Sequence, residues 1–473
     1  MNTTTNNASR SQLYTLITVF FFWGFVAASN GILIPLFKEK FSLSQFQSQL
    51  VDFAFYAAYF VGSLLYFLVS RAIGGDPLNR IGYKNGIVYG LLLSAVGAVL
   101  FYPAASMGSY PLLLAALFTV GLGFSLQQTA AQTLTIALGD PATGNQRLNL
   151  AGGVNNFGTT IGPVLISFAI FGAISENAAA NATIDSVKIP YLVLAGVFVI
   201  FAIFFKYSNL PSITNNEAVE TGSGALKFPQ LTLGMVAIFV YVGVEVSIAS
   251  NLGEYLRQTM NLDSAKISQY VSLFWASMMI GRWSGAVSAF NPTATTEKIM
   301  KVVVPYVAFG VFIVVNILRG SDLTDLYVYG VCILVLIAAN FMGKDRPARM
   351  LLIYSILGAV AMLIGLLSTG TVALFAFISG GLFCSVMWPC IFPLAIAGLG
   401  KYTNQGASFL IMMILGGAII PPMQGKFADS IGIHYSYIVA LVCFLFLAWF
   451  SVRVKTILKS QGIDYEANMG GGH

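Results

Sequence analysis

Long apolar stretches alternate with short polar ones along almost the whole chain. Each apolar stretch is about 20 residues or longer, which is enough for an α-helix to cross the hydrocarbon core of a bilayer. A transmembrane β-barrel would instead show short strands of alternating polarity. We therefore predict an all-α polytopic membrane protein. The predicted spans are 13–37, 45–70, 85–103, 109–138, 147–173, 190–207, 229–256, 265–289, 299–318, 326–342, 347–369, 372–398, 403–425 and 434–458.

Composition agrees with this class. The chain is 57% hydrophobic and 9% charged, whereas a soluble domain is about 25% charged. The N-terminal segment MNTTTNNASRSQ lacks the features of a cleavable signal peptide, so we expect the first apolar stretch to be retained. All four cysteines lie in apolar spans and are interpreted as small core residues.

The basic residues predict the orientation. With both termini inside, sixteen Lys and Arg residues lie on the inner side and seven on the outer side. The positive-inside rule then places both termini in the cytoplasm, and the net charge of +6 is a topology signal rather than a nucleic-acid patch. We expect a multi-pass protein of a bacterial inner membrane, monomeric, with the lipid bilayer as its surroundings.

The two halves of the chain resemble each other. AASNG (27–31) is echoed by IASNL (248–252), IALG (136–139) by AGLG (397–400), and GTTIGP (158–163) by GGAIIPP (416–422), in the same order. Parallel repeats of this kind are the plan of major facilitator transporters. We predict a six-helix bundle over 1–207, a cytoplasmic linker over 208–228, a second bundle over 229–458 and a cytoplasmic tail over 459–473.

Several blocks carry a resemblance to one family. They are FFFWGFVAASNGILIPLF (20–37), FQSQLVDFAFYAAYFVGS (46–63), QTAAQTLTIALGDPATGNQRLNLAGGVNNFGTTIGP (128–163), GRWSG (281–285) and YTNQGASFLIMMILGGAIIPPMQG (402–425). The chain resembles the fucose permease-like branch of the major facilitator superfamily, whose members are sugar symporters. The resemblance implies a twelve-helix core, alternating access, and cation-coupled uptake of a monosaccharide.

The chain departs from this family first in length. Fourteen spans are predicted where the family has twelve, and the surplus lies mainly at 299–343. We interpret this segment as a helical hairpin inserted between the eighth and ninth helices of the core. Its two spans are almost wholly apolar, with Asn316 and Asn340 near their ends, so a peripheral, lipid-facing addition is expected. A role in dimerisation or regulation is the alternative.

The second departure concerns the coupling acids. The family pattern has one carboxylate in helix one and one in helix four, but the matching positions here are Gly31 and Gln128. Asp52 is the only charge within 45–70, and such an acid costs a few kcal/mol on insertion scales, so it usually serves a function. We expect Asp52 to replace the missing acids.

Amides and hydroxyls are expected around Asp52. The predicted cation-coupling set is Asp52, Asn30, Gln49, Gln128 and Thr129. Oxygen ligands suit a hard monovalent cation, so Na⁺ is the first expectation for Asp52. A proton carrier and a structural acid near the outer mouth are the alternatives.

The sugar site is expected to combine amides, aromatic rings and an acid. Its candidates are Asn155, Asn156, Gln132, Glu245, Asn251, Trp275 and Trp388. The resemblance assigns Asn155 to a sugar-site position, whereas Gly152 stands where the family has a glutamine, so the sugar can differ from fucose. Glu245 can instead be a second coupling site or the ion-pair partner of Arg282.

A further motif lies between the second and third spans. RAIGGDPLNRIGYK contains Asp76, Arg80 and Lys84 and resembles the superfamily motif whose charges latch the two halves; a solvated loop is the alternative. No GxxxxGK[ST] loop and no catalytic constellation occurs, so an ATP-driven pump and an enzyme are disfavoured. The sequence predicts a secondary transporter, a Na⁺-coupled monosaccharide symporter without cofactor, for glucose, mannose, galactose or N-acetylglucosamine. A proton symporter or a uniporter is the alternative.

Overall fold

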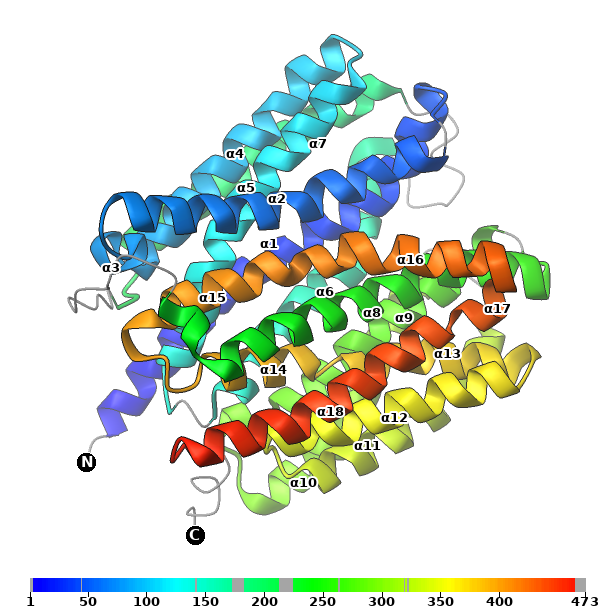
Figure 1. The fold of residues 1–473 in the computed structure, drawn as a ribbon. Helices are drawn as coiled ribbons and strands as arrows, with labels where there is room; N and C mark the ends of the chain where they lie inside the picture. Colours follow the sequence, from blue (N-terminus) through cyan, green and yellow to red (C-terminus); the bar gives the residue numbers. More distant parts are fainter. Residues whose placement is uncertain are drawn as a thin grey trace. The chain divides into compact units, whose positions relative to one another are not determined.

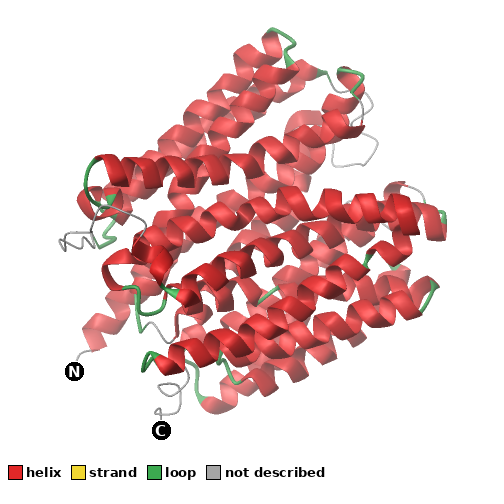
Figure 2. Cartoon of the chain, in the orientation of Figure 1, coloured by secondary structure: helices red, strands yellow, loops and turns green. Residues whose placement is uncertain are grey.

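The computed structural model consists of α-helices joined by turns and short loops (Figures 1 and 2). It describes residues 3–43, 45–140, 143–171, 183–211, 224–262, 264–318, 320 and 323–463, and no strand occurs within these ranges. The helices of the first half of the chain are α1 (Thr3–Lys40), α2 (Gln45–Ala72), α3 (Pro77–Ile81), α4 (Tyr83–Ser106), α5 (Tyr110–Ala137), α6 (Gly144–Phe171) and α7 (Lys188–Tyr207). Those of the second half are α8 (Pro229–Met260), α9 (Ser264–Ala286), α10 (Ala294–Leu318), α11 (Gly330–Gly343), α12 (Pro347–Leu367), α13 (Gly370–Cys384), α14 (Met387–Ile396), α15 (Thr403–Met412), α16 (Gly416–Ile431), α17 (Ile433–Ser436) and α18 (Ile438–Ser460).

The all-α fold class is confirmed. Within the described residues, eleven helical segments are long and apolar enough to span a membrane, and they coincide with eleven of the predicted spans. The predicted spans 13–37, 147–173 and 265–289 fall on α1, α6 and α9, which are helical but are not among the eleven. Fourteen spans are therefore not established.

The chain divides into two compact units. The first unit comprises Met1–Leu138, Ile161–Lys227 and Leu399–Leu415, and the second comprises Gly139–Thr160, Phe228–Gly398 and Gly416–His473. These units do not coincide with the predicted halves, because each half gives one helical segment to the other unit. Residues 144–160 of α6 belong to the second unit, and the whole of α15 belongs to the first.

In the first unit, α4 packs between α5 and α7, and α5 also contacts α2 and α15 (Figure 1). Gly90 of α4 faces Gly123 of α5, and a Cβ atom on Gly90 would lie 2.7 Å from the Gly123 carbonyl oxygen. Paired small residues allow the backbones of two membrane helices to approach this closely. The pair therefore fixes where α4 and α5 cross.

In the second unit, α8 contacts α9, α13, α14, α16 and α18. The predicted inserted segment forms α10 and α11, which pack on α9 and α12 respectively and on each other. Their other sides expose apolar side chains, including Ile299, Val303, Val307, Val331 and Leu334. These exposed side chains are apolar, and a lipid-facing position for the segment stays a prediction.

Candidate substrate and coupling site

A polar stripe runs along α5 in the first unit. Gln128 donates from Nε2 to the Tyr59 hydroxyl of α2 at 3.1 Å. Gln132 lies one turn later on the same face, is 6% exposed, and its Oε1 has no hydrogen-bond partner among the described residues. A buried polar atom without a partner is costly, so Gln132 is suited to accept from a ligand hydroxyl.

The neighbouring side chains of α5 serve the packing of the bundle. Gln127 accepts a hydrogen bond from the Trp23 indole at 3.0 Å and donates to Ser94 Oγ at 3.0 Å. The Thr129 hydroxyl donates to the Ser125 carbonyl of its own helix at 2.9 Å. Thr129 is therefore buried within the first unit, on a different face of α5 from Gln128.

Asp52 is half-buried near the start of α2. It precedes Tyr59 by seven residues, so the two share a helix face and are separated by about 10 Å. The side chains of Asn30 and Gln49, two more members of the predicted cation set, lie outside the described residues. Of the predicted partners of Asp52, Gln128 of α5 therefore contacts the face of α2 that carries Asp52, through its hydrogen bond to Tyr59.

In the second unit, Arg282 of α9 connects four elements. Its Nη1 donates to Asn156 Oδ1 and, at 3.4 Å, to the Gly152 carbonyl, both on α6. Its Nη2 donates to the Tyr241 hydroxyl of α8 at 3.1 Å. Arg282 is only 9% exposed, so its charge is held almost entirely by these protein groups.

The fourth partner of Arg282 is the Ser385 carbonyl, which a proline four residues later leaves without its helical donor. Arg282 Nε donates to the Ser385 carbonyl at 3.0 Å, at the point where α13 ends. In a continuous helix this carbonyl would accept from the N–H of residue 389, but Pro389 has none. The broken helix α13–α14 thus leaves one carbonyl available for the guanidinium.

Glu245 lies on α8 beside this network. It forms a hydrogen bond with the Tyr241 hydroxyl, and Arg282 is the cation that acts on its charge. Glu245, Tyr241 and Arg282 therefore form a linked set, and the role of Glu245 as a sugar ligand, a second coupling site or the ion-pair partner of Arg282 stays a prediction. Tyr241 lies between the acid and the base and bonds to both.

The remaining sugar-site candidates occupy different positions. Asn155 is half-buried, and Asn251 donates from Nδ2 to the Ser247 carbonyl of its own helix at 2.9 Å. Trp275 is half-buried and contacts Phe274 edge-on. Trp388 stacks on Phe392 and lies 6.3 Å from the Tyr241 ring, and its Nε1 has no partner among the described residues. The set is split, because Gln132 belongs to the first unit and the others to the second.

Asn149 was not predicted from the sequence. It is fully buried on α6, and both its amide atoms lack hydrogen-bond partners within the described part of the chain. A Cβ atom on Gly285 would lie 2.9 Å from Asn149 Nδ2, so Gly285 leaves the space that the amide fills. The spacing of seven residues between Asn149 and Asn156, which puts both on one helix face, was the available signal.

The predicted latch motif lies in the first unit. Asp76 caps α3 through a hydrogen bond from the Asn79 N–H at 3.1 Å, and it accepts from the Tyr66 hydroxyl at 2.7 Å and from Asn404 Nδ2 at 3.3 Å. Burial raises the pKa of Asp76, although these hydrogen bonds act against the rise. Asn404 opens α15, so the motif binds a helix from the second half of the chain.

The two basic residues of the motif act locally. Arg80 donates to the Ile73 carbonyl at 2.6 Å, and Lys84 donates to the Ser208 carbonyl at 3.3 Å. Neither contact reaches α15. Among the three predicted latch residues, Asp76 is the one that bonds to the second half of the chain.

Comparison with known proteins identifies the family. The Major Facilitator Superfamily profile matches residues 14–343. The chain belongs to the major facilitator superfamily. It is 33% identical over 445 residues to a glucose/galactose transporter of Brucella abortus, covering 93% of each chain. It is 26% identical over 453 residues to the L-fucose-proton symporter of Escherichia coli, covering 91% of this chain and 90% of that one.

A solved structure agrees. The crystal structure of the major facilitator transporter FucP in the outward conformation superposes with a TM-score of 0.71 at 25% identity, over 94% of this chain and 99% of that chain. The resemblance to the fucose permease branch is confirmed, and the chain is a transporter rather than an enzyme. The chain has the all-helical major facilitator fold, with about eleven to twelve membrane-spanning helices.

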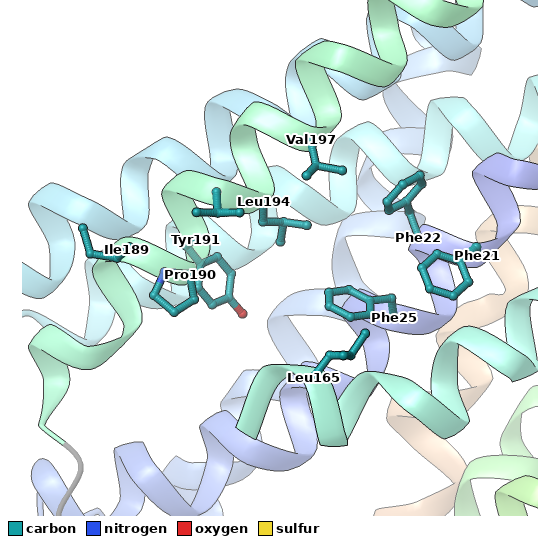
Figure 3. Close-up of a pocket in the computed structure, with 10 residues that line it drawn as sticks. Phe21, Phe22, Phe25, Leu165, Ile189, Pro190, Tyr191, Leu194 and Val197 are labelled. Carbon is teal, nitrogen blue, oxygen red and sulfur yellow. The ribbon is translucent and has the colours of Figure 1, made fainter. Parts of the chain in front are cut away.

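One cavity of this superfamily member is apolar. It has a volume of about 320 Å³ and lies in the first unit between α1, α6 and α7 (Figure 3). Its walls are phenylalanine, leucine, valine, isoleucine and proline side chains, with the Tyr191 hydroxyl pointing inward. A sugar needs several hydrogen-bonding groups, so this cavity is not the sugar site.

Proposed function

We propose that the protein is a secondary transporter that carries a monosaccharide together with a proton into a bacterial cell by alternating access. Glucose and galactose are the first candidate substrates, with mannose and N-acetylglucosamine next. The observation that carries the proposal is the 33% identity to a glucose/galactose transporter along 93% of the chain. The proton takes the place of the Na⁺ expected from the sequence, because the related fucose symporter is named for protons.

Buried polar atoms without partners support a sugar ligand. Gln132 Oε1, the Asn149 amide and Trp388 Nε1 lack hydrogen-bond partners among the described residues. Sugar hydroxyls both donate and accept, so they can satisfy such groups, and the Trp388 ring offers an apolar face. Asn155, Asn156, Asn251 and Trp275 remain proposed members of the site.

Asp52 is the proposed proton-carrying residue. It is the one charged residue within the apolar stretch 45–70, whereas the family's carboxylate positions are occupied here by Gly31 and Gln128. Gln128, Thr129, Asn30 and Gln49 remain its proposed surroundings. Glu245 is engaged with Tyr241 and Arg282, so we assign it to the polar network rather than to direct proton carriage.

Asp76 is the proposed latch of the transport cycle. By the predicted orientation, the starts of α6 and α15 both lie on the cytoplasmic side. Each helix start belongs to the unit formed mainly by the other half of the chain. The bonds that hold them, from Asn404 to Asp76 and from Asn145 to Asp345, therefore have to break when the cytoplasmic side opens. Arg80 holds the loop that carries Asp76, whereas Lys84 joins the start of α4 to the residue that follows α7.

The proposed topology has fourteen spans with both termini in the cytoplasm. It adds α1, α6 and α9 to the eleven apolar helices, and it treats α10 and α11 as a hairpin inserted into a twelve-helix core. An even number of spans keeps the positive-inside bias described above. The polar linker 208–228 and the tail 459–473 are then cytoplasmic.

Uptake into proteoliposomes tests the function. Radiolabelled glucose and galactose are offered under an inward proton gradient, an inward Na⁺ gradient, or neither. We expect accumulation of at least one sugar with the proton gradient alone. Equal final levels inside and outside under all three conditions would indicate a uniporter, and accumulation with Na⁺ alone would restore the first expectation.

Two variants locate the roles. Asp52→Asn should abolish accumulation while leaving exchange of sugar across the membrane, and the exposed acid Asp429 gives a matched control in Asp429→Asn. Gln132→Ala should raise KM with little change in kcat, because it removes one acceptor of the bound sugar. Full accumulation by Asp52→Asn would exclude the assignment of the proton to this residue.

A further inference from the structure

A buried ion cluster joins the inserted helices to the rest of the second unit. Lys301 of α10 lies 2.6 Å from Glu297 Oε1 and 2.7 Å from Asp345 Oδ2. Ser288 Oγ lies 2.8 Å from one oxygen of each acid. The Lys301 and Asp345 side chains are 7% and 13% exposed, so the cluster is largely shielded from water.

The cluster depends on Lys301. Two carboxylates meet one ammonium group, and removal of the ammonium would leave two like charges close together with little solvent. Breaking a buried pair in this way is strongly destabilising for the local arrangement. Lys301 therefore decides where the Asp345 side chain lies.

Asp345 in turn shapes the connection from α11 to α12. Lys344 and Asp345 adopt φ angles of +51° and +54°, a left-handed conformation that non-glycine residues rarely adopt. The turn directs the Asp345 carbonyl towards α6, where it accepts from Asn145 Nδ2 at 3.2 Å. Asn145 is 1% exposed and lies in the first turn of α6.

The inserted helices are also fixed to the core by buried polar bonds. Asn340 of α11 donates to Ser284 Oγ of α9 and accepts from the Tyr354 hydroxyl of α12 at 2.6 Å. The Tyr329 hydroxyl, just before α11, lies 2.8 Å from Ser277 Oγ of α9. Such bonds in an apolar setting fix one register of the helices, so the segment is not a loosely attached addition.

We infer that residues 294–345, which contain the predicted insertion 299–343, hold the first part of α6 on the second unit, with Lys301 and Asp345 as positioning residues that act through Asn145. The segment thereby stabilises the conformation in which residues 144–160 are attached to that unit. Its effect on transport rests on the proposed function, whereas the attachment itself does not.

Cysteine labelling without sugar tests the attachment. Asn149 on α6 is fully buried, so Asn149→Cys, in a chain whose four native cysteines are replaced, reports release of this segment to a membrane-permeant maleimide. We expect Lys301→Ala to raise the labelling rate at least tenfold. Lys298→Ala on the same helix removes an equal but exposed charge and should leave the rate unchanged.

Two further variants keep the test decisive. Lys301→Arg preserves the ion pairs and should label at a rate near that of the parent chain. Asn145→Ala removes only the bond to the Asp345 carbonyl and should raise the rate severalfold in a folded protein. Parent-like labelling of both Asn145→Ala and Lys301→Ala would overturn the inference. Because no sugar is present, a failure of the transport proposal would not alter these rates.

Discussion

The starts of α6 and α15 are equivalent in sequence but are fastened differently. Both open with an Asn-Gln pair, Asn145-Gln146 and Asn404-Gln405, after a short polar loop. Asn404 accepts from the Tyr83 hydroxyl at 2.6 Å and donates to Asp76 and Asn79 side chains. Asn145 makes one bond, to the Asp345 carbonyl, and its Oδ1 has no partner within the described residues.

The difference lies in what the neighbouring acid does. At α15 the carboxylate of Asp76 itself accepts from Asn404. At α6 the carboxylate of Asp345 is occupied by Lys301 and Ser288, so only its main-chain oxygen reaches the asparagine. The carboxylate of Asp345 is therefore engaged by Lys301 of the insertion, whereas that of Asp76 is available to its asparagine. The start of α6 then depends more on Arg282 of α9, which bonds to Gly152 and Asn156 further along α6.

Removing Arg282 should give the largest effect. Arg282→Ala removes four hydrogen bonds, to α6, to α8 and to the end of α13, and leaves Glu245 without its cation, so we expect a loss of about 3–5 kcal/mol in stability. Thermal unfolding in detergent measures this. Arg282→Lys should recover part of the loss, since one ammonium cannot reproduce the planar fork. Unfolding at the same temperature as the parent would contradict the dependence of α6 on this residue.

Removing the Asp76 carboxylate should have the next largest effect. Asp76→Ala loses the cap of α3 and the bond from Asn404, worth about 1–3 kcal/mol. Asp76→Asn keeps an acceptor oxygen and should retain most of the contact with α15. Labelling of a cysteine in place of Ser408 on α15 distinguishes the two, and equal rates for both variants would count against a latch through Asp76.

The pH dependence of the same contact follows from burial. The pKa of Asp76 is raised above its ordinary value of 3.8, so the buried, latched state binds the proton more tightly than an open state in which Asp76 meets water. The stabilisation is complete below pH 3.8 and is lost as the pH rises through the raised pKa. Labelling at residue 408 should become faster over that rise in the parent chain and stay constant in Asp76→Asn. A parent chain with a flat profile would refute this.

The last comparison is between the two asparagines. Asn404→Ala removes three hydrogen bonds and Asn145→Ala removes one, and each bond contributes about 1 kcal/mol. We expect the first variant to lower the unfolding temperature more than the second. Equal shifts would indicate that the two helix starts are held alike.

Local patterns predicted much of this structure. The span predicted at 45–70 is α2 (Gln45–Ala72), because apolar length alone determines a membrane helix. The contact of Asp76 with the second half followed from its motif. The sequence left three roles open for Glu245, and the position of Tyr241 between Glu245 and Arg282 could not be predicted from it.

Other features needed three-dimensional information. The ion cluster joins residues 288, 297, 301 and 345, which no periodicity connects. The burial of Asn149 depends on Gly285, a residue 136 positions later. The break between α13 and α14 could be placed near Pro389, but the use of the freed carbonyl by Arg282 depends on a helix a hundred residues earlier.

That freed carbonyl has a consequence for reading mutational data. The missing N–H of Pro389 leaves the Ser385 carbonyl available to Arg282 as one of its four partners. A substitution such as Pro389→Ala would restore a competing helical donor for Ser385. A screen for transport defects would then find similar phenotypes for substitutions at residues 389, 282 and 156. Their common cause would be the orientation of one guanidinium group rather than a wider binding surface.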